Sequence, residues 1–165
     1  MCRPASFVLT KDRVFWSINT DSHEDIIAEH KLHQDGVRGP NILRIEITPP
    51  DDDFTAPAKK WNFRLDQDIM PAWFDAEKDE KRARLELAKW IKSRVIRKDC
   101  KELCSGRFII CDSARVGSVY GSASVGSVYD SAVVRQYGGT VAAPVGPQAV
   151  VIDARSHKAV CIVGE

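Results

Sequence analysis

The sequence has no marked excess of charge of either sign. Its 24 Lys and Arg residues nearly balance 23 Asp and Glu residues, which leaves a formal net charge of +1. A protein that holds nucleic-acid phosphates usually carries a strongly basic field, and an inhibitor that mimics DNA carries an acidic one. Neither nucleic-acid binding nor DNA mimicry is therefore indicated.

The sequence also lacks a long apolar run. No stretch approaches the roughly 18 to 20 apolar residues that cross a bilayer as a helix, and the first residues, MCRPASF, contain no hydrophobic signal-peptide segment. The five cysteines are odd in number and unevenly spaced, which favours a reducing compartment over a disulfide framework. We therefore expect a cytoplasmic protein outside the membrane.

A nine-residue repeat fills residues 111–137, which read CDSARVGSV, YGSASVGSV and YDSAVVRQY. A Ser-Ala pair recurs in register, and two further positions do so as well. The first is Val116, Val125 and Val134, and the second is Val119, Val128 and Tyr137. A unit this short cannot bury its own apolar face, so copies must stack. A five-residue period does not fit, and the sequence has no Gly-Gly-x-Gly-x-Asp spacing of calcium-binding β-rolls. The pattern predicts a short β-solenoid in which two blocks form one coil of about 18 residues.

The N-terminal half predicts a small sheet. Residues 7–10 and 13–17 are rich in β-formers and are separated by two polar turn residues, so they indicate a hairpin. Residues 43–48 and 61–65 alternate between apolar and polar side chains, as half-buried strands do. We expect these last two segments to pair.

Two helices are expected beside this sheet. Ser22 stands three residues before Asp25 and just ahead of an apolar pair, which is a capping-box pattern for a short helix that ends near Leu32. Residues 76–94 are strong helix formers with apolar residues on one side, and Asp75 is their expected N-cap.

These patterns together predict an α+β fold with two domains. An α+β domain over residues 1–98 contains the one long helix, and a short β-solenoid of nine-residue repeats follows over residues 105–165. Residues 149–152 and 159–163 should form a hairpin that caps the open end of the solenoid.

Several segments together resemble a known group of proteins. They are MCRPASFVLTKDRVFWS, TDSHEDII, NFRLDQDIMPAWFD and the repeats GSASVGSVYDSAVV. They are similar to an uncharacterised family found in phages and prophages, which pairs a small N-terminal α+β domain with a solenoid of pentapeptide-like repeats. The resemblance implies a phage-linked protein that interacts with its host, and it transfers no site residue.

Cys2 is the most reactive-looking residue. Removal of the initiator Met would leave Cys2 at the N-terminus, where its own α-amino group could act as a base beside the thiol. The alternative is a cysteine without a role, which is the favoured interpretation. His23 and Glu24 could supply an acid/base pair, but they also stand where helix-cap residues belong, and the cap is the stronger interpretation.

Cys100 and Cys104 could bind zinc together with His23, His30 or His33. Their C-x3-C spacing is permissive, and no second pair of ligands lies at finger-like spacing. We therefore favour the absence of a metal or other cofactor.

The segment with Gln67, Met70, Trp73 and Phe74 matches the pattern by which peptides dock on sliding clamps. In that pattern a Gln is followed by an aliphatic residue three positions later and then by two adjacent aromatics. Packing of these side chains at the entry of the long helix is the competing and favoured interpretation.

The function expected from the sequence is a non-enzymatic protein-interaction module that acts on a host protein. An enzyme that uses Cys2 is the alternative. A solenoid presents a long regular surface, and we expect Tyr120 and Tyr129 to stack on it as exposed contact residues. Pairing of that face would give a homodimer.

Overall fold

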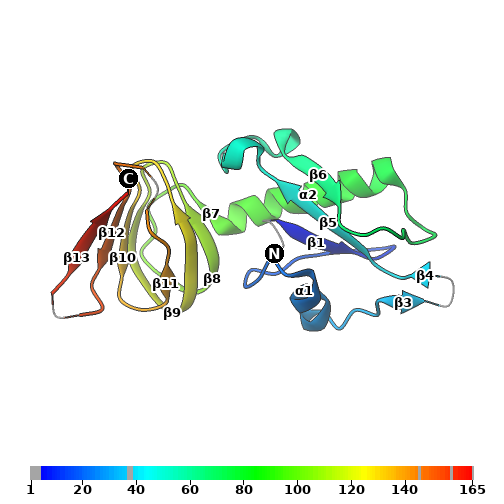
Figure 1. Ribbon diagram of the computed structural model, residues 1–165, viewed down its shortest axis with the longest axis horizontal. Coiled ribbons are helices and arrows are strands. Elements are labelled where there is room, and N and C mark those ends of the chain that lie inside the picture. Colours follow the sequence, from blue (N-terminus) through cyan, green and yellow to red (C-terminus); the bar gives the residue numbers. More distant parts are fainter. Residues whose placement is uncertain (1–4, 37–38, 145, 157, 165) are drawn as a thin grey trace. The chain divides into compact units, whose positions relative to one another are not determined.

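The computed structural model describes residues 5–36, 39–144, 146–156 and 158–164. The chain divides into two compact units, of which the first ends at Ile91 and the second begins at Lys92. The first is an α+β unit with the long helix, and the second is a β-solenoid (Figure 1). The predicted fold class is thereby confirmed.

A four-stranded antiparallel sheet forms the first unit. Its order is β2 (Val14–Phe15), β1 (Ser6–Leu9), β5 (Leu43–Thr48) and β6 (Asn62–Leu65). The predicted N-terminal hairpin and the predicted pairing of the two alternating strands are both present. The remaining short elements of this unit are β3 (Asp35–Gly36), β4 (Gly39–Pro40), η1 (Pro50–Asp52) and η2 (Ala58–Lys60).

The two helices begin where the sequence predicts. Helix α1 (His23–Glu29) has Ser22 as its N-cap, whose side chain accepts a hydrogen bond from the Asp25 N–H. Helix α2 (Ala76–Arg94) follows Asp75, whose carboxylate accepts from the Lys78 N–H. Helix α1 ends three residues earlier than expected, because Lys31 adopts a positive φ of 52° that a right-handed helix does not contain.

One part of the core of the first unit lies between the sheet and α2, and another, with Ile26 and Ile27 of α1, lies against Val8. Leu43, Ile45 and Ile47 of β5 are fully buried, as the alternation predicts. On α2 the buried residues are Ala83, Leu87 and Trp90, which share one helical face. The ring of Trp90 meets that of Trp61 edge-on, with 6.0 Å between ring centroids, an arrangement that aromatic pairs prefer.

The second unit is a stack of parallel rungs closed by one antiparallel strand. The sheet path runs β13, β12, β10, β9, β8, β7, and β11 also pairs with β9. The strands are β7 (Val95–Ile96), β8 (Leu103–Ile110), β9 (Arg115–Val128), β10 (Val133–Gln136), β11 (Thr140–Val141), β12 (Val150–Asp153) and β13 (Val160–Val163). The solenoid therefore begins earlier than residue 105, since β7 already pairs with β8.

The register gives each coil two nine-residue blocks. Ile110 pairs with Val128, which follows it by 18 positions, and Val116 pairs with Val134 at the same spacing. Val134 then pairs with Val151. These residues are almost completely buried, so they form the apolar columns that the repeat predicts.

The second residue of each block has a left-handed backbone conformation, and so does Gly139, nine residues after the last of them. The φ angles are 59° at Asp112, 62° at Gly121, 55° at Asp130 and 61° at Gly139. Asp tolerates this region better than most residues, and Gly adopts it freely. The Asp112 N–H donates to the Asp130 carboxylate at 2.8 Å, one coil away. These residues form the corners of the coils. The nine-residue period is therefore the number of residues from one corner to the next.

The repeat departs from regularity in its third block. The pairing of β10 with β9 shifts between Val134 and Gln136, so that Gln136 takes the place opposite Val119. Gln136 is consequently buried, and Tyr137 is 51% exposed. The expected equivalence of Tyr137 with Val119 is thus wrong, because one bulge moves the tyrosine out of the column.

Among the described residues, no helix has both the length and the apolar character needed to cross a membrane.

Candidate functional site

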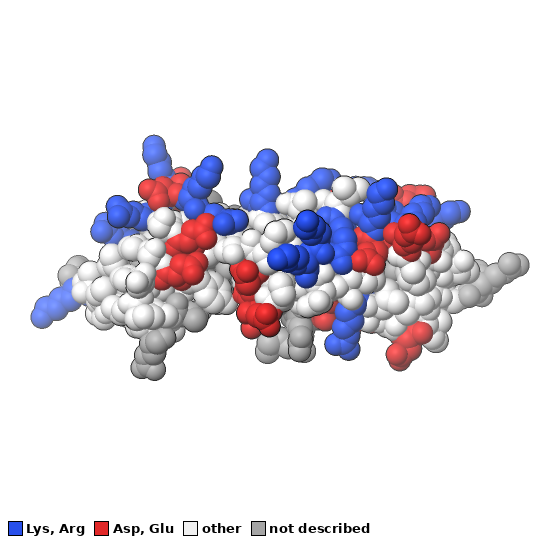
Figure 2. Space-filling model, turned by 90° about the horizontal axis from the view of Figure 1, so that it is seen from above, with Lys and Arg blue, Asp and Glu red and all other residues white. Residues whose placement is uncertain are grey.

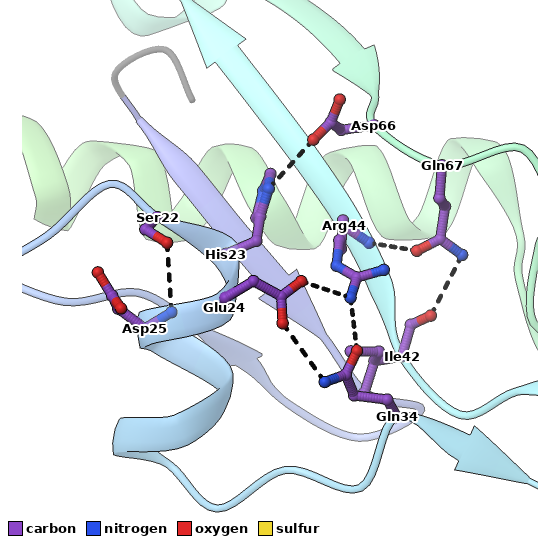
Figure 3. A network of polar contacts seen from close by, with 9 residues as sticks. All are labelled: Ser22, His23, Glu24, Asp25, Gln34, Ile42, Arg44, Asp66 and Gln67. Atoms are coloured by element: carbon purple, nitrogen blue, oxygen red, sulfur yellow. Dashed lines mark hydrogen bonds and ion pairs between the residues drawn. The ribbon is translucent and has the colours of Figure 1, made fainter. Parts of the chain in front are cut away.

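A buried histidine anchors a polar cluster in the first unit. Its Nδ1 lies 3.2 Å from the carboxylate of Asp66, and its Nε2 lies 3.0 Å from the carbonyl oxygen of Ile45 (Figure 3). The residue is His23, the first of α1, and it is 3% exposed. Both neighbours are hydrogen-bond acceptors, so both ring nitrogens are engaged. The ring thus ties α1 to β5 and to the segment after β6.

A second set of contacts centres on Arg44 of β5. Its guanidinium lies 2.8 Å from the Glu24 carboxylate and also donates to the Gln34 side-chain oxygen. Gln67 accepts from the Arg44 N–H at 2.8 Å and donates to the carbonyls of Ile42 and Ile69. Figure 3 shows these side chains converging from α1, β5 and the segments around them.

These contacts favour a structural role for His23 and Glu24. The histidine faces Asp66 and Ile45, whereas the glutamate faces Arg44 and Gln34. The two side chains therefore do not act on each other as an acid/base pair. The contacts instead lock the short helix onto the sheet.

The clamp-like segment is partly used inside its own unit. The Gln67 side chain is engaged in three hydrogen bonds with backbone groups. Met70, Trp73 and Phe74 are half-buried, and a turn closes between the Pro71 carbonyl and the Phe74 N–H. A glutamine that already completes the backbone pairing beside β5 is not free to be the polar anchor of a docking peptide.

The described thiols do not converge on a metal-binding arrangement. Cys104 is exposed, and the Cys100 thiol lies 3.3 Å from the carbonyl oxygen of Glu102. Within residues 5–36, 39–144, 146–156 and 158–164, no group of three or more His, Cys, Asp or Glu side chains could hold a metal ion. Cys2, the expected nucleophile, lies outside the described residues.

Tyr120 and Tyr129 do not stack on each other. They are nine positions apart, which is half a coil, whereas residues stack at a full coil. Tyr120 follows the column of Val119, and Tyr129 follows that of Val128. The expected shared tyrosine face is therefore wrong: the repeat was correctly identified, but consecutive blocks lie on opposite sides of a coil. The Tyr120 hydroxyl donates to Glu102 at 3.1 Å, and this bond raises the pKa of Tyr120.

A groove of about 600 Å³ lies on the outer face of the solenoid. Its lining combines three cationic side chains with one acid and a floor of small and aliphatic residues. They are Asp99, Cys100, Lys101, Arg115, Val116, Gly117, Val133, Arg135 and Ile152. A β-carbon at Gly117 would stand 2.7 Å from the Lys101 carbonyl oxygen, so a larger residue there would press on the backbone of the neighbouring rung.

The register explains why these residues meet. Arg115 pairs with Val133, and Arg135 pairs with Ile152. Arg115 and Val133 are both the fifth residue of their blocks, and Gly117 and Arg135 are both the seventh. Comparing the first block with the third, one coil away, would have revealed the groove. Comparison of neighbouring blocks does not reveal it, because they lie half a coil apart.

The cations of the groove are exposed and have no ion pair within the described part of the chain. Lys101, Arg115 and Arg135 are exposed side chains, and the described ion pairs involve other residues. Elsewhere on each unit, the face drawn in Figure 2 mixes both signs of charge. The groove lining therefore carries three cations and one acid, Asp99, which gives it a local excess of positive charge.

The fold and groove define a protein with an α+β unit and a short β-solenoid whose outer face carries a cationic groove. No protein-family model matches the chain, and no curated protein or solved structure is significantly similar to it.

Proposed function

We propose that the chain is a non-enzymatic protein-interaction module that binds an acidic segment of a partner protein in the solenoid groove. The observation that supports the proposal is the group of Lys101, Arg115 and Arg135 in the lining of one groove. Exposed cations of this kind raise the association rate and select partners of opposite charge.

We propose a host protein as this partner. The resemblance of the sequence segments to a family of phages and prophages implies a protein that would act in the host cytoplasm, for example as an inhibitor of a host or defence factor. The pair His23 and Glu24 gives no competing enzymatic proposal, because their polar groups are directed at separate partners within the fold.

A charge-reversal experiment tests the groove. The variant Arg115→Glu/Arg135→Glu is compared with Lys98→Glu/Lys158→Glu, which changes the net charge of the same unit equally at exposed positions outside the groove lining. A fluorescein-labelled decaglutamate peptide serves as the probe, and fluorescence anisotropy at low salt measures its binding. We expect the groove variant to bind at least about tenfold more weakly and the control to bind within about twofold of the wild type.

The same three baits then identify the natural partner. Tagged proteins are expressed in a bacterial host, and quantitative mass spectrometry compares what they retain. A partner should be retained by the wild type and the control and lost with the groove variant. Equal probe binding by all three proteins, or equal loss in both variants, contradicts a groove-specific interaction.

A further inference from the structure

The last strand of the solenoid is an edge strand that lacks the usual protection against pairing with another strand. Strand β13 pairs with β12 alone, and no other described strand pairs with its outer side. All four of its residues, Val160, Cys161, Ile162 and Val163, are exposed. Natural sheets protect their edges with charges, proline, bulges or very short strands, and β13 contains no charged residue and no proline.

The opposite end of the solenoid is protected. Its edge strand, β7, has only two residues, and one of them, Val95, is buried. The charged residues Arg97, Lys98 and Asp99 follow directly, and Arg97 pairs with Asp112. This contrast shows that the chain uses the usual protection at one end and omits it at the other.

The apolar core also continues into β13. Ile162 pairs with Val151, so the two side chains point to the same face of the sheet. Val151 is 1% exposed and belongs to the column of Val134, whereas Ile162 is 40% exposed. Terminal repeats of solenoids normally present a polar outer face. Here the apolar column ends at Ile162, whose side chain is exposed to solvent.

We propose that β13 pairs antiparallel with β13 of a second copy of the chain, giving a closed two-fold dimer joined end to end through the solenoids. The partner is a second copy of the chain, because two β13 strands without charged residues do not repel each other. Pairing also supplies hydrogen bonds for the outer backbone groups of both strands and covers Ile162 in both copies.

The charges near the strand favour the antiparallel arrangement. Asp153 ends β12, and the turn that follows contains Arg155 and Lys158, which leaves one excess positive charge at this end of β13. A parallel pair would place the two positive turns side by side. The antiparallel pair separates them by the length of the strand.

Two-fold symmetry limits the register to a few choices. In an isologous antiparallel pair, the residue on the axis must face its own copy. With Cys161 on the axis, Val160 faces Ile162 of the other copy and Val163 faces Ala159. With Ile162 on the axis, Val160 would instead face Gly164, which has no side chain. The Cys161 register therefore covers the most exposed valines best, because Val160 and Val163 are 54% and 51% exposed.

Sedimentation equilibrium of the full chain tests the dimer. The wild type should have twice the 18.4 kDa mass of one chain at tens of micromolar. Ile162→Lys, whose long side chain can still reach solvent, should weaken association at least about a hundredfold. Tyr137→Lys is the matched control, since Tyr137 is a similarly exposed apolar residue of the solenoid, and it should remain a dimer.

Three outcomes overturn the proposal. They are a wild-type monomer at 100 micromolar, which leaves the edge open to a strand of another protein; a mass that rises without limit, which rules out a closed pair; and an unchanged dimer in Ile162→Lys. Val160→Lys provides a second disruption of the same edge, and far-ultraviolet circular dichroism shows that each variant is folded. The groove substitutions Arg115→Glu/Arg135→Glu should leave the dimer intact, so failure here and failure of the proposed function are distinguishable.

A thiol cross-link tests the register. Opposed residues in an antiparallel pair have Cα atoms roughly 4.5 to 5.5 Å apart, within reach of a short bis-maleimide. In a Cys104→Ser background, mass spectrometry should find Cys161 of one copy linked to Cys161 of the other. Moving the thiol with Cys161→Ser/Val163→Cys should abolish that link, because position 163 faces Ala159. A dimer in which Cys161 does not cross-link overturns the pairing.

Discussion

The alignment of the strands has a different physical basis in each of the two units. In the first unit, alignment around β5 depends on side chains that occur once, such as Gln67, which completes the hydrogen bonding of Arg44, Ile42 and Ile69. In the solenoid, alignment depends on repetition, because equivalent residues such as Val116 and Val134 stack one coil apart. The first unit should therefore be sensitive at individual polar residues, and the solenoid should be sensitive to the phase of its repeat.

The substitution with the largest expected effect on stability tests the phase of the nine-residue repeat. Val125→Asp places a charge in a column where Val125 is 1% exposed, and we expect it to reduce the free energy of unfolding of the solenoid by more than about 3 kcal/mol. Ser124→Asp introduces the same charge one residue earlier, on the opposite face of β9, and should be tolerated within about 1 kcal/mol. Urea denaturation followed by circular dichroism measures both. Equal destabilisation would show that the assigned phase is incorrect.

A substitution with an intermediate expected effect on stability tests the contacts that occur only once in the fold. Gln67→Ala removes three hydrogen bonds and leaves partly buried backbone groups without them, so we expect a loss of about 1 to 3 kcal/mol. The comparison in the solenoid is Ser131→Ala, which removes one exposed bond to the Asp112 carbonyl and should cost less than about 0.5 kcal/mol. The same denaturation experiment decides between them. If Ser131→Ala costs as much as Gln67→Ala, the contrast between the units is wrong.

The smallest effect concerns the turn between β12 and β13. Hydrogen bonds from Arg155 lower the pKa of Asp153 to about 2. A carboxyl with a lowered pKa in the folded state stabilises it above its unfolded value of about 4, and this contribution is lost as the pH falls toward about 2. Arg155→Ala should raise the pKa of Asp153 by more than about one unit, as measured by an NMR titration of its carboxyl carbon. An unchanged pKa would mean that the Arg155 side chain does not set it.

Local patterns were sufficient to predict most elements of the fold. The caps at Ser22 and Asp75, the alternation in β5 and the nine-residue blocks each depend on neighbouring residues, and each is confirmed. The contacts of Arg44 and the groove were not predicted, because they depend on residues that are distant in the chain. The Arg44 contacts join positions 10 to 23 apart, and the groove joins alternate blocks.

The bulge near Gln136 could not be predicted from the repeat. Tyr137 occupies the ninth place of its block, where the other blocks have Val119 and Val128. A large tyrosine side chain does not fit a column built for valine, so the chain shifts by one residue and buries Gln136 instead, whose amide donates to the Gly139 carbonyl. Sequence periodicity predicts an ideal register, and side-chain size decides where the register fails.

The alternation of Asp and Gly at the corners restricts how this array can change length. Loss or gain of 18 residues keeps aspartate above aspartate and glycine above glycine, as in the bond from the Asp112 N–H to Asp130. A change of nine residues would bring an aspartate to the place of Gly121, where a β-carbon would stand 2.6 Å from the Cys104 carbonyl oxygen. The length of the solenoid can therefore change only in whole rungs of about 4.8 Å, and the same kinds of side chain face outward at every length.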